Sequence, residues 1–203
     1  MTHWEGPFPA FRPPEGFWAD RDYWAPEVRE YEGSYYMFAS FKADGVARAT
    51  QILRSDHPRG PFVPHGEGPI TPAGWECLDG TLYVEKEGGG SSDAAGRGVG
   101  SGKGRPWIVF CREWLEVRDG QMWAMPLSPD LQSAAGEPIL LFSASEAPWV
   151  RPARETDEFV TDGPFLYRED EGRLFMLWSS VGERGYGEGA FRERHDRGSL
   201  ETG

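Results

Sequence analysis

One pattern of residues occurs three times in this chain, and this repetition limits the possible folds more than any other feature. The copies lie in residues 24–40, 79–111 and 162–179. Each copy consists of a short apolar run, a polar turn that carries Gly, and a second apolar run. Two apolar runs joined by such a turn predict a β-hairpin. When the copies are aligned, the first column holds Trp24, Asp79 and Asp162.

A hairpin that recurs at spacings of tens of residues is typical of propellers and solenoids. The 17 Pro and 27 Gly lie mostly between apolar runs and favour many short strands over helices. We therefore predict an all-β fold of the β-propeller type, in which each hairpin forms the inner half of an antiparallel, four-stranded blade. Because the pattern accounts for about three blades and a closed ring needs at least four, the predicted propeller is incomplete.

The predicted propeller domain covers residues 1–187. Residues 88–104 interrupt the second hairpin with a Gly-rich run that cannot bury enough apolar surface to order itself. Since the repeat resumes directly after this run, we interpret it as a flexible insertion at a hairpin tip. The pattern decays after Val181, and the polar segment 188–203 is expected to be a poorly ordered tail.

Composition excludes several classes of function. The net charge of −12 argues against a nucleic-acid partner, because binding to phosphates requires a basic surface. No apolar run approaches the roughly 18 residues of a membrane span, and the N-terminus shows no apolar signal segment. We therefore expect no membrane partner and leave the compartment open, cytoplasmic by default. Cys77 and Cys111 flank one hairpin and are either a disulfide in an exported protein or two free buried thiols.

Neither a metal nor an organic cofactor is predicted. The four His are dispersed, with no two at the spacing of metal ligands. The Gly-rich run lies between two strands and not before a helix, which excludes a nucleotide-binding loop.

The first column of the repeat predicts where a site would lie. The first strand of each blade lines the central channel of a propeller, so Trp24, Asp79 and Asp162 are expected to share one axial pocket. Two carboxylates beside an aromatic ring suit glycoside hydrolysis, in which one carboxyl group protonates the leaving oxygen and another activates water. The alternative is that the Asp of each Asp-Gly pair is only a turn residue that the repeat reuses.

Three blocks carry a resemblance to a known family. WAPEV at 24–28, LDGTLYV at 78–84 and DGPFLY at 162–167 resemble glycoside hydrolase family 43, a family of five-bladed β-propellers. The resemblance covers most of residues 3–187. It implies an arabinofuranosidase- or xylosidase-like hydrolase that cleaves O-glycosyl bonds in arabinose-, xylose- or galactofuranose-containing oligosaccharides and polysaccharides. It also implies an inverting mechanism with a general base, an Asp that tunes pKa values, and a general acid Glu.

Only some of these family roles can be assigned to residues of this sequence. Asp79 resembles the tuning Asp, and Asp162 stands where the family usually has its acid Glu, although Asp is one methylene shorter. We therefore name Glu113 as a substitute acid; the alternative is a strand-end charge beside Arg112.

The general base of the family lies in its first blade, and no residue of this chain resembles it. Asp20 and Asp22 are interpreted as loop residues. The chain thus resembles blades two to four of the family, and the implied expectation is a fragment that is weak or inactive alone.

Two alternative functions remain open. The Trp75-Glu76-Cys77 triplet resembles the related five-bladed family 32 of fructan and sucrose hydrolases, in which Glu76 would be the acid of a retaining mechanism. A non-catalytic carbohydrate-binding propeller would use its indoles to stack on sugars, unless they only fill the core. The candidate stacking residues are Trp24, Trp75 and Trp114, with Trp18 nearby in the sequence.

Overall fold

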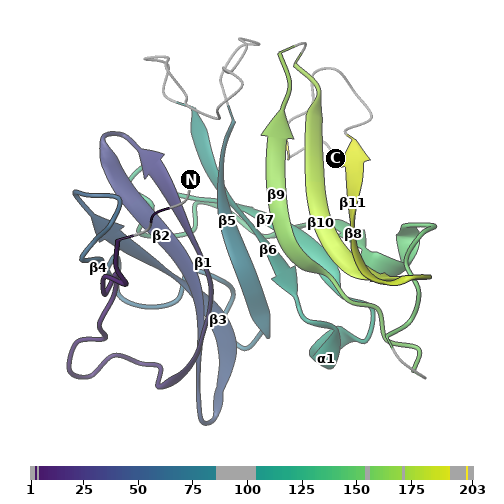
Figure 1. Cartoon of the computed structure of the whole chain (residues 1–203), viewed down its shortest axis with the longest axis horizontal. Helices are drawn as coiled ribbons and strands as arrows, with labels where there is room; N and C mark the ends of the chain where they lie inside the picture. The colour runs from purple at the N-terminus through teal and green to yellow at the C-terminus, as the bar shows by residue number, and fades with distance from the viewer. Residues whose placement is uncertain are drawn as a thin grey trace.

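The structure of the chain is a computed structural model that describes residues 3, 5–85, 104–153, 156–170, 172–192 and 200. Three antiparallel sheets stand side by side along the long axis of the molecule (Figure 1). The first contains β1 (Arg21–Tyr31), β2 (Ser34–Ala43), β3 (Val46–Ser55) and β4 (Val63–Pro64). The second contains β5 (Cys77–Glu85), β6 (Arg105–Arg112), β7 (Gln121–Pro126) and β8 (Ile139–Ser143). The third contains β9 (Asp162–Arg168), β10 (Leu174–Gly182) and β11 (Gly185–Arg192).

The only helical elements in these ranges are short. Helix α1 (Trp114–Val117) follows β6, and the 3-10 turn η1 (Ala144–Glu146) follows β8. Neither is long and apolar enough to cross a bilayer. The prediction of an all-β chain with three antiparallel, blade-like sheets is confirmed.

The hairpins form where the repeat predicts them. In the β1–β2 turn, Glu32 and Gly33 both have left-handed φ values, of 47° and 79°. A two-residue hairpin with a type I′ turn requires this conformation at both positions, and Gly adopts it without a steric penalty. In the second sheet, β5 and β6 pair from Cys77–Arg112 to Glu85–Arg105. Most of the predicted insertion between them lies outside the described residues.

The second sheet is buried on both faces, because successive side chains of a strand point to opposite sides. On β6, Ile108 and Phe110 pack toward the first sheet, whereas Trp107 and Val109 pack toward the third. Cys77 and Cys111 are buried on this sheet as free thiols, and burial raises the pKa of both. The sheets therefore hold together through two apolar layers, one on each side of the central sheet.

The outer faces of the two flanking sheets differ. The segment 10–19 covers the outer face of the first sheet, where the Phe17 ring meets the Phe41 ring at a centroid distance of 5.2 Å. On the third sheet, Leu177 and Phe165 are paired across the strands and remain about two-fifths exposed, at 42% and 39%. One outer face is thus part of the core and the other is open.

The predicted decay of the pattern after Val181 is wrong for residues 185–192, which form β11. This strand pairs with β10 from Gly182–Gly185 to Phe175–Arg192. Its small residues resemble a loop in the sequence, but they let the strand pass close to an aromatic ring: a Cβ atom at Gly189 would collide with the Trp149 indole. The predicted domain end at 187 therefore falls inside a strand, and most of the predicted tail lies outside the described residues.

Candidate active site

The pocket lies near the starts of β1, β5 and β9, which are the inner strands of the three sheets, and each of these strands is irregular there. The pairing register shifts around Trp24 in β1, between Leu78 and Thr81 in β5, and opposite Asp162 in β9. Such bulges turn side chains away from the regular alternation, and they are common next to active sites. Left-handed φ values accompany the shifts, at Ala25 (43°), Asp79 (54°) and Gly163 (54°). The residues of the first column of the repeat, Trp24, Asp79 and Asp162, therefore lie at or next to these bulges.

These strand starts surround a hollow of about 610 Å³. Most residues predicted for the site line it: Trp24, Asp79, Glu113, Trp114 and Asp162. It is also lined by Ala25, Arg48, Leu78, Leu115, Gly163, Ser179 and Tyr186. The structure thus brings together the carboxylates and two of the indoles that the sequence placed at one site.

Trp75 does not line this pocket. Its ring packs on the Trp123 ring at a centroid distance of 4.9 Å, and the Arg112 guanidinium lies 4.0 Å from its centroid. Trp18 is also elsewhere, in the layer that covers the first sheet. Both indoles are occupied by protein contacts, which is the core-filling alternative for Trp residues.

Asp79 is the carboxylate between the second and third sheets. It accepts a hydrogen bond from the Gly163 backbone N–H at 2.9 Å, and its own N–H donates to Ser40 Oγ at 3.0 Å. Burial raises the pKa of Asp79 to about 6, and the negative charge of Asp162 adds to this effect, while Gly163 and Arg48 oppose it. A carboxyl group with this pKa exchanges its proton close to neutral pH.

Asp162 is held by a residue that the sequence did not identify. The Tyr186 hydroxyl, on β11, donates a hydrogen bond to the Asp162 carboxylate. Burial raises the pKa of Asp162, and the Tyr186 hydrogen bond opposes the rise. Burial and the neighbouring Asp162 also raise the pKa of Tyr186, which therefore remains a hydrogen-bond donor. No motif marked Tyr186, because it lies in the segment expected to lose its pattern.

Glu113 lies at the junction between β6 and α1 and is only 6% exposed. Its Oε2 lies 2.6 Å from Nη1 of Arg48. This contact is a close ion pair between two side chains that are each only 7% exposed. Burial raises the pKa of Glu113, opposed by Arg48 and assisted by Glu76 and Asp162.

The alternative pairing of Glu113 with Arg112 does not occur. Arg112 instead pairs with Glu116 at 2.5 Å, one turn along the short helix. Glu113 is therefore a pocket residue and not a solvated charge at the end of a strand.

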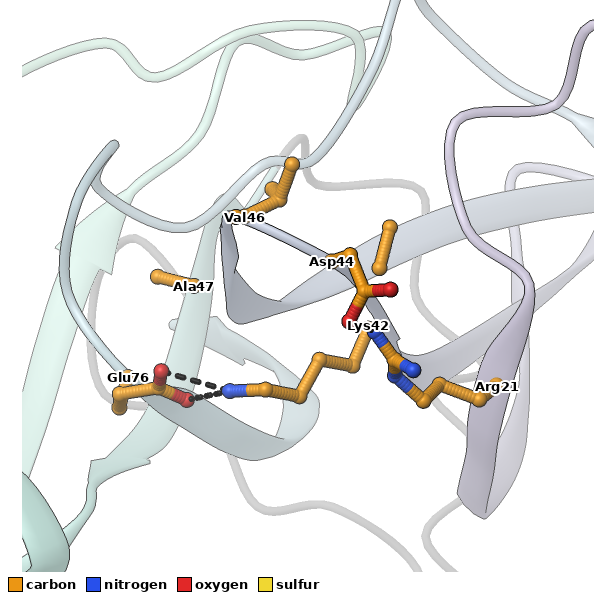
Figure 2. A pocket seen from close by; sticks show the side chains of 8 residues that line it. Arg21, Lys42, Asp44, Val46, Ala47 and Glu76 are labelled. Atoms are coloured by element: carbon orange, nitrogen blue, oxygen red, sulfur yellow. Dashed lines mark hydrogen bonds and ion pairs between the residues drawn. The ribbon is translucent and has the colours of Figure 1, made fainter.

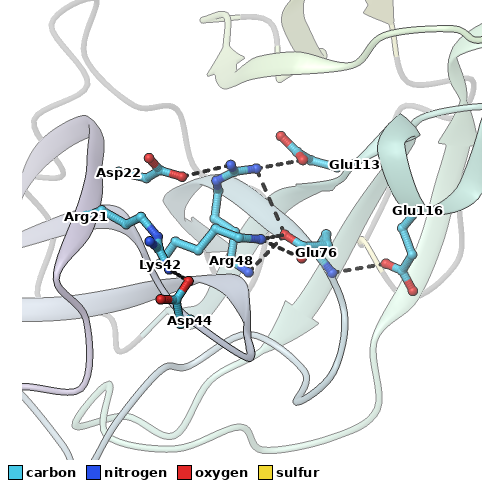
Figure 3. A network of polar contacts seen from close by, with 8 residues as sticks. All are labelled: Arg21, Asp22, Lys42, Asp44, Arg48, Glu76, Glu113 and Glu116. Atoms are coloured by element: carbon cyan, nitrogen blue, oxygen red, sulfur yellow. Dashed lines mark hydrogen bonds and ion pairs between the residues drawn. The ribbon is translucent and has the colours of Figure 1, made fainter.

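Arg48, on β3, lines the pocket and contacts three carboxylates, of which Glu113 also lines it (Figure 3). Its Nη2 lies 3.0 Å from Asp22 Oδ2, and its guanidinium lies 4.2 Å from the centroid of the Trp24 ring. The interpretation of Asp22 as a loop residue is therefore wrong, since it lies on β1 and binds this guanidinium. No motif of the sequence marked Arg48 as a residue that lines the pocket.

Glu76 is a carboxylate held by a cation and a backbone N–H. Lys42 Nζ donates to both of its carboxylate oxygens, at 2.6 and 2.8 Å (Figure 2), and the Arg48 backbone N–H donates at 3.0 Å. Burial alone would raise the pKa of Glu76, but these contacts outweigh it and lower the pKa. Glu76 lines a second hollow, of about 410 Å³, outside the carboxylate pocket. Contacts that favour the ionised form of Glu76 do not support the family 32-like general-acid role, which stays untested.

Within the described ranges, no group of three or more His, Cys, Asp and Glu side chains is arranged to hold a metal ion. The carboxylate pocket itself presents carboxyl groups, the Arg48 guanidinium and two indoles.

Comparisons with known proteins agree with this geometry. Residues 1–91 match the family model of "Glycosyl hydrolases family 43". A "Xylosidase/arabinosidase" of Bacteroides ovatus is 35% identical over 72 residues, which are 33% of this chain and 22% of that protein. The solved endo-arabinase of Bacteroides thetaiotaomicron VPI-5482 has a TM-score of 0.81 and 45% identity, over 93% of this chain and 62% of its own.

A thermostable family-43 glycoside hydrolase shares the fold, with a TM-score of 0.65 and 21% identity over 88% of this chain and 53% of its own. The chain thus spans less than two thirds of the length of each of these relatives. The matched family model, the similarity to the endo-arabinase and the shared fold agree with one another. Residues 1–91 therefore correspond to part of a glycoside hydrolase family 43 domain.

Proposed function

We propose that the carboxylate pocket binds arabinose- or xylose-containing polysaccharides and cleaves their O-glycosyl bonds. One observation carries the proposal: the buried Glu113 and the half-buried Asp79 and Asp162, each with a raised pKa, converge on one hollow that two indoles also line. Glycoside hydrolysis requires a carboxyl group that is protonated near neutral pH, and burial provides such groups. The choice of pentose is supported by the relatives, which are named as an endo-arabinase and a xylosidase/arabinosidase.

We assign the general acid to Glu113. The hydrogen bond from Tyr186 favours the ionised form of Asp162. Glu113 is only 6% exposed, and its burial outweighs the ion pair with Arg48, so its pKa is raised. Glu is also one methylene longer than Asp and reaches farther toward a glycosidic oxygen. In this assignment Asp79, whose charge interacts with that of Asp162, tunes the pKa values of the pocket.

The mechanism that we propose is inverting, with a second carboxylate that activates water. No residue in the described part of the chain is assigned as this base. We therefore expect weak turnover by the 203-residue chain.

The general-acid role has a test that separates it from simple binding. Protonation of the leaving oxygen matters for a sugar leaving group, but little for a dinitrophenolate, which leaves without a proton. E113Q should therefore lose about 10²–10⁴-fold in kcat on arabino-oligosaccharides and much less on a dinitrophenyl arabinofuranoside. D162N is the matched variant. If D162N shows this leaving-group dependence and E113Q does not, the acid is Asp162.

A second candidate is a carbohydrate-binding propeller without catalysis. It is favoured by the exposed Trp24 ring, which is 46% exposed at the pocket, and by the lack of an assigned base. Arabino- and xylo-oligosaccharides should be titrated into the chain with tryptophan fluorescence as the readout, alongside an assay of released reducing sugar. Binding with hydrolysis supports the enzyme, binding alone supports the second candidate, and the absence of both contradicts both.

A further inference from the structure

A continuous chain of charged contacts joins the second hollow to the carboxylate pocket (Figures 2 and 3). It begins at Lys42, whose Nζ binds both oxygens of Glu76. Glu76 Oε2 accepts the backbone N–H of Arg48 and lies 4.0 Å from its Nη1. The Arg48 guanidinium then reaches Glu113 at 2.6 Å and Trp24 at 4.2 Å. Lys42 and Glu76 thus act on the pocket without lining it.

We propose that Glu76 and Lys42 are positioning residues that fix Arg48 and so keep Glu113 as the proton carrier of the pocket. This inference rests on the proposed function, in which Glu113 is the general acid. It also assigns a role to Glu76 that differs from the acid role its sequence context implied.

Arg48 depends on its neighbours for its orientation. An Arg side chain has many rotamers, and holding it in one orientation costs conformational entropy. Arg48 is only 6% exposed, and its Nε has no hydrogen-bond partner in the described ranges, so its place depends on its ion pairs. Glu76 contacts both the backbone and the guanidinium of Arg48, which ties the start of β3 and the side chain to one anchor. Lys42 in turn holds that anchor through both carboxylate oxygens.

The charged network around Arg48 has more carboxyl groups than cations. The network contains two cations, Lys42 and Arg48, and three carboxyl groups, Asp22, Glu76 and Glu113. If all three carboxyl groups were ionised, the partly buried cluster would carry one uncompensated negative charge, which a low-dielectric site disfavours. A proton on one carboxyl group restores the balance. Glu113 is the most buried of the three, at 7% side-chain exposure against 25% for Asp22 and 26% for Glu76.

The charged groups that act on Glu113 come from several elements. Arg48 approaches from β3 and lowers its pKa, whereas Glu76, which precedes β5, and Asp162, from β9, raise it. Asp22, from β1, acts indirectly because it shares the Arg48 guanidinium. Removing the charge of Glu76 removes a negative charge that repels ionised Glu113. It also leaves the Arg48 guanidinium with fewer carboxylates to neutralise. Both effects favour ionised Glu113, which can no longer donate a proton.

The test is a direct titration of Glu113 by carbon-13 NMR, in the full chain labelled at Glu side-chain carboxyl groups, with E113Q to assign the signal. We expect E76Q to move the midpoint of Glu113 to lower pH. We expect K42Q, which leaves three carboxyl groups with one cation, to move it to higher pH. Opposite shifts from two adjacent residues are not expected from a general loss of packing. D44N is the matched control, because Asp44 binds Arg21 at the same hollow and has no contact with Arg48 in the described residues.

A Glu113 midpoint that stays unchanged in E76Q, or that moves in the same direction in both variants, overturns the inference. The second readout is the pH profile of kcat on arabino-oligosaccharides, whose basic limb should move to lower pH in E76Q with little change in KM. If Glu113 shifts as expected but the chain neither binds nor cleaves these sugars, the positioning role stands and the proposed function fails. If the sugars are cleaved and E76Q leaves the pH profile of kcat unchanged, the proposed function stands and the positioning role fails.

Discussion

The starts of the inner strands and the middle of the central sheet are built in opposite ways. At the strand starts the pairing register shifts, backbone angles are left-handed, and carboxyl groups are buried beside one another. In the middle of β6 the ladder with β7 is continuous, and Ile108, Val109 and Phe110 are fully buried. The regular region therefore stabilises the fold, whereas the irregular strand starts lower its stability because they hold reactive groups.

The largest expected effect comes from the regular region. Phe110→Ala should lower the free energy of unfolding by about 3–5 kcal/mol, because it removes a fully buried ring and leaves a cavity between the first and second sheets. Urea unfolding followed by tryptophan fluorescence measures the change. Phe165→Ala is the control, since this ring is 39% exposed on the open face and should cost about 1 kcal/mol or less. Equal losses in the two variants would break the comparison.

An effect of opposite sign is expected at the strand starts. The folded-state pKa of Asp79, about 6, lies above its unfolded value of roughly 3.9, so folded Asp79 binds its proton more tightly. Its contribution to stability is therefore complete below about pH 4 and is lost as the pH rises through about 6. Asp79→Asn removes the buried charge and should raise the free energy of unfolding by about 1–3 kcal/mol at pH 8.

The gain of Asp79→Asn should shrink as the pH falls from 8 to 5, while hydrolysis of arabino-oligosaccharides decreases at every pH. Asn also tolerates the left-handed backbone at this position, which limits the strain of the substitution. A variant that is less stable than the parent chain at pH 8 would show that the strand starts carry no such cost.

The smallest expected effect concerns Tyr186. Tyr186→Phe removes the hydroxyl that donates to Asp162, and the loss of this hydrogen bond should raise the pKa of Asp162 further. The cost in stability should be about 1 kcal/mol. Carbon-13 NMR of Asp side-chain carboxyl groups gives the pKa change. Trp114→Phe, at the same pocket but without a contact to Asp162 in the described chain, is the control and should leave that titration unchanged.

Much of the fold could be predicted from the sequence, because hairpin signals are local. Alternating apolar runs and Glu-Gly turns identified the paired inner strands, and their repetition led to the blade-like sheets. The shared pocket of Trp24, Asp79 and Asp162 followed from the same repeat, since equivalent positions of equivalent strands converge. Strand β11 was missed because its Gly-rich sequence fits a strand only next to the Trp149 ring.

The electrostatics of the site could not be predicted in the same way. Arg48 and Tyr186 come from the third strands of their sheets, β3 and β11, and reach the pocket only because bulges and strand ends bring them there. The pairing of Glu113 with Arg48, and not with its neighbour Arg112, depends on where the short helix α1 places Glu116. Trp75 was assigned to the pocket from its residue type, but its ring packs on Trp123 instead. Such choices between neighbours are tertiary, and single-sequence patterns do not record them.

The open face of the third sheet has a consequence for handling the protein in solution. Phe165, Tyr167 and Leu177 form an exposed stripe of large hydrophobic side chains, and the Arg29 guanidinium lies 4.9 Å from the centroid of the Phe165 ring. The net charge of −12 otherwise keeps copies of the chain apart. That mutual repulsion disappears near the isoelectric point of about 4.8, and high salt screens it at any pH. Colloidal attraction through the stripe should then dominate, so light scattering should rise toward pH 5 and fall again when Leu177 is replaced by Lys.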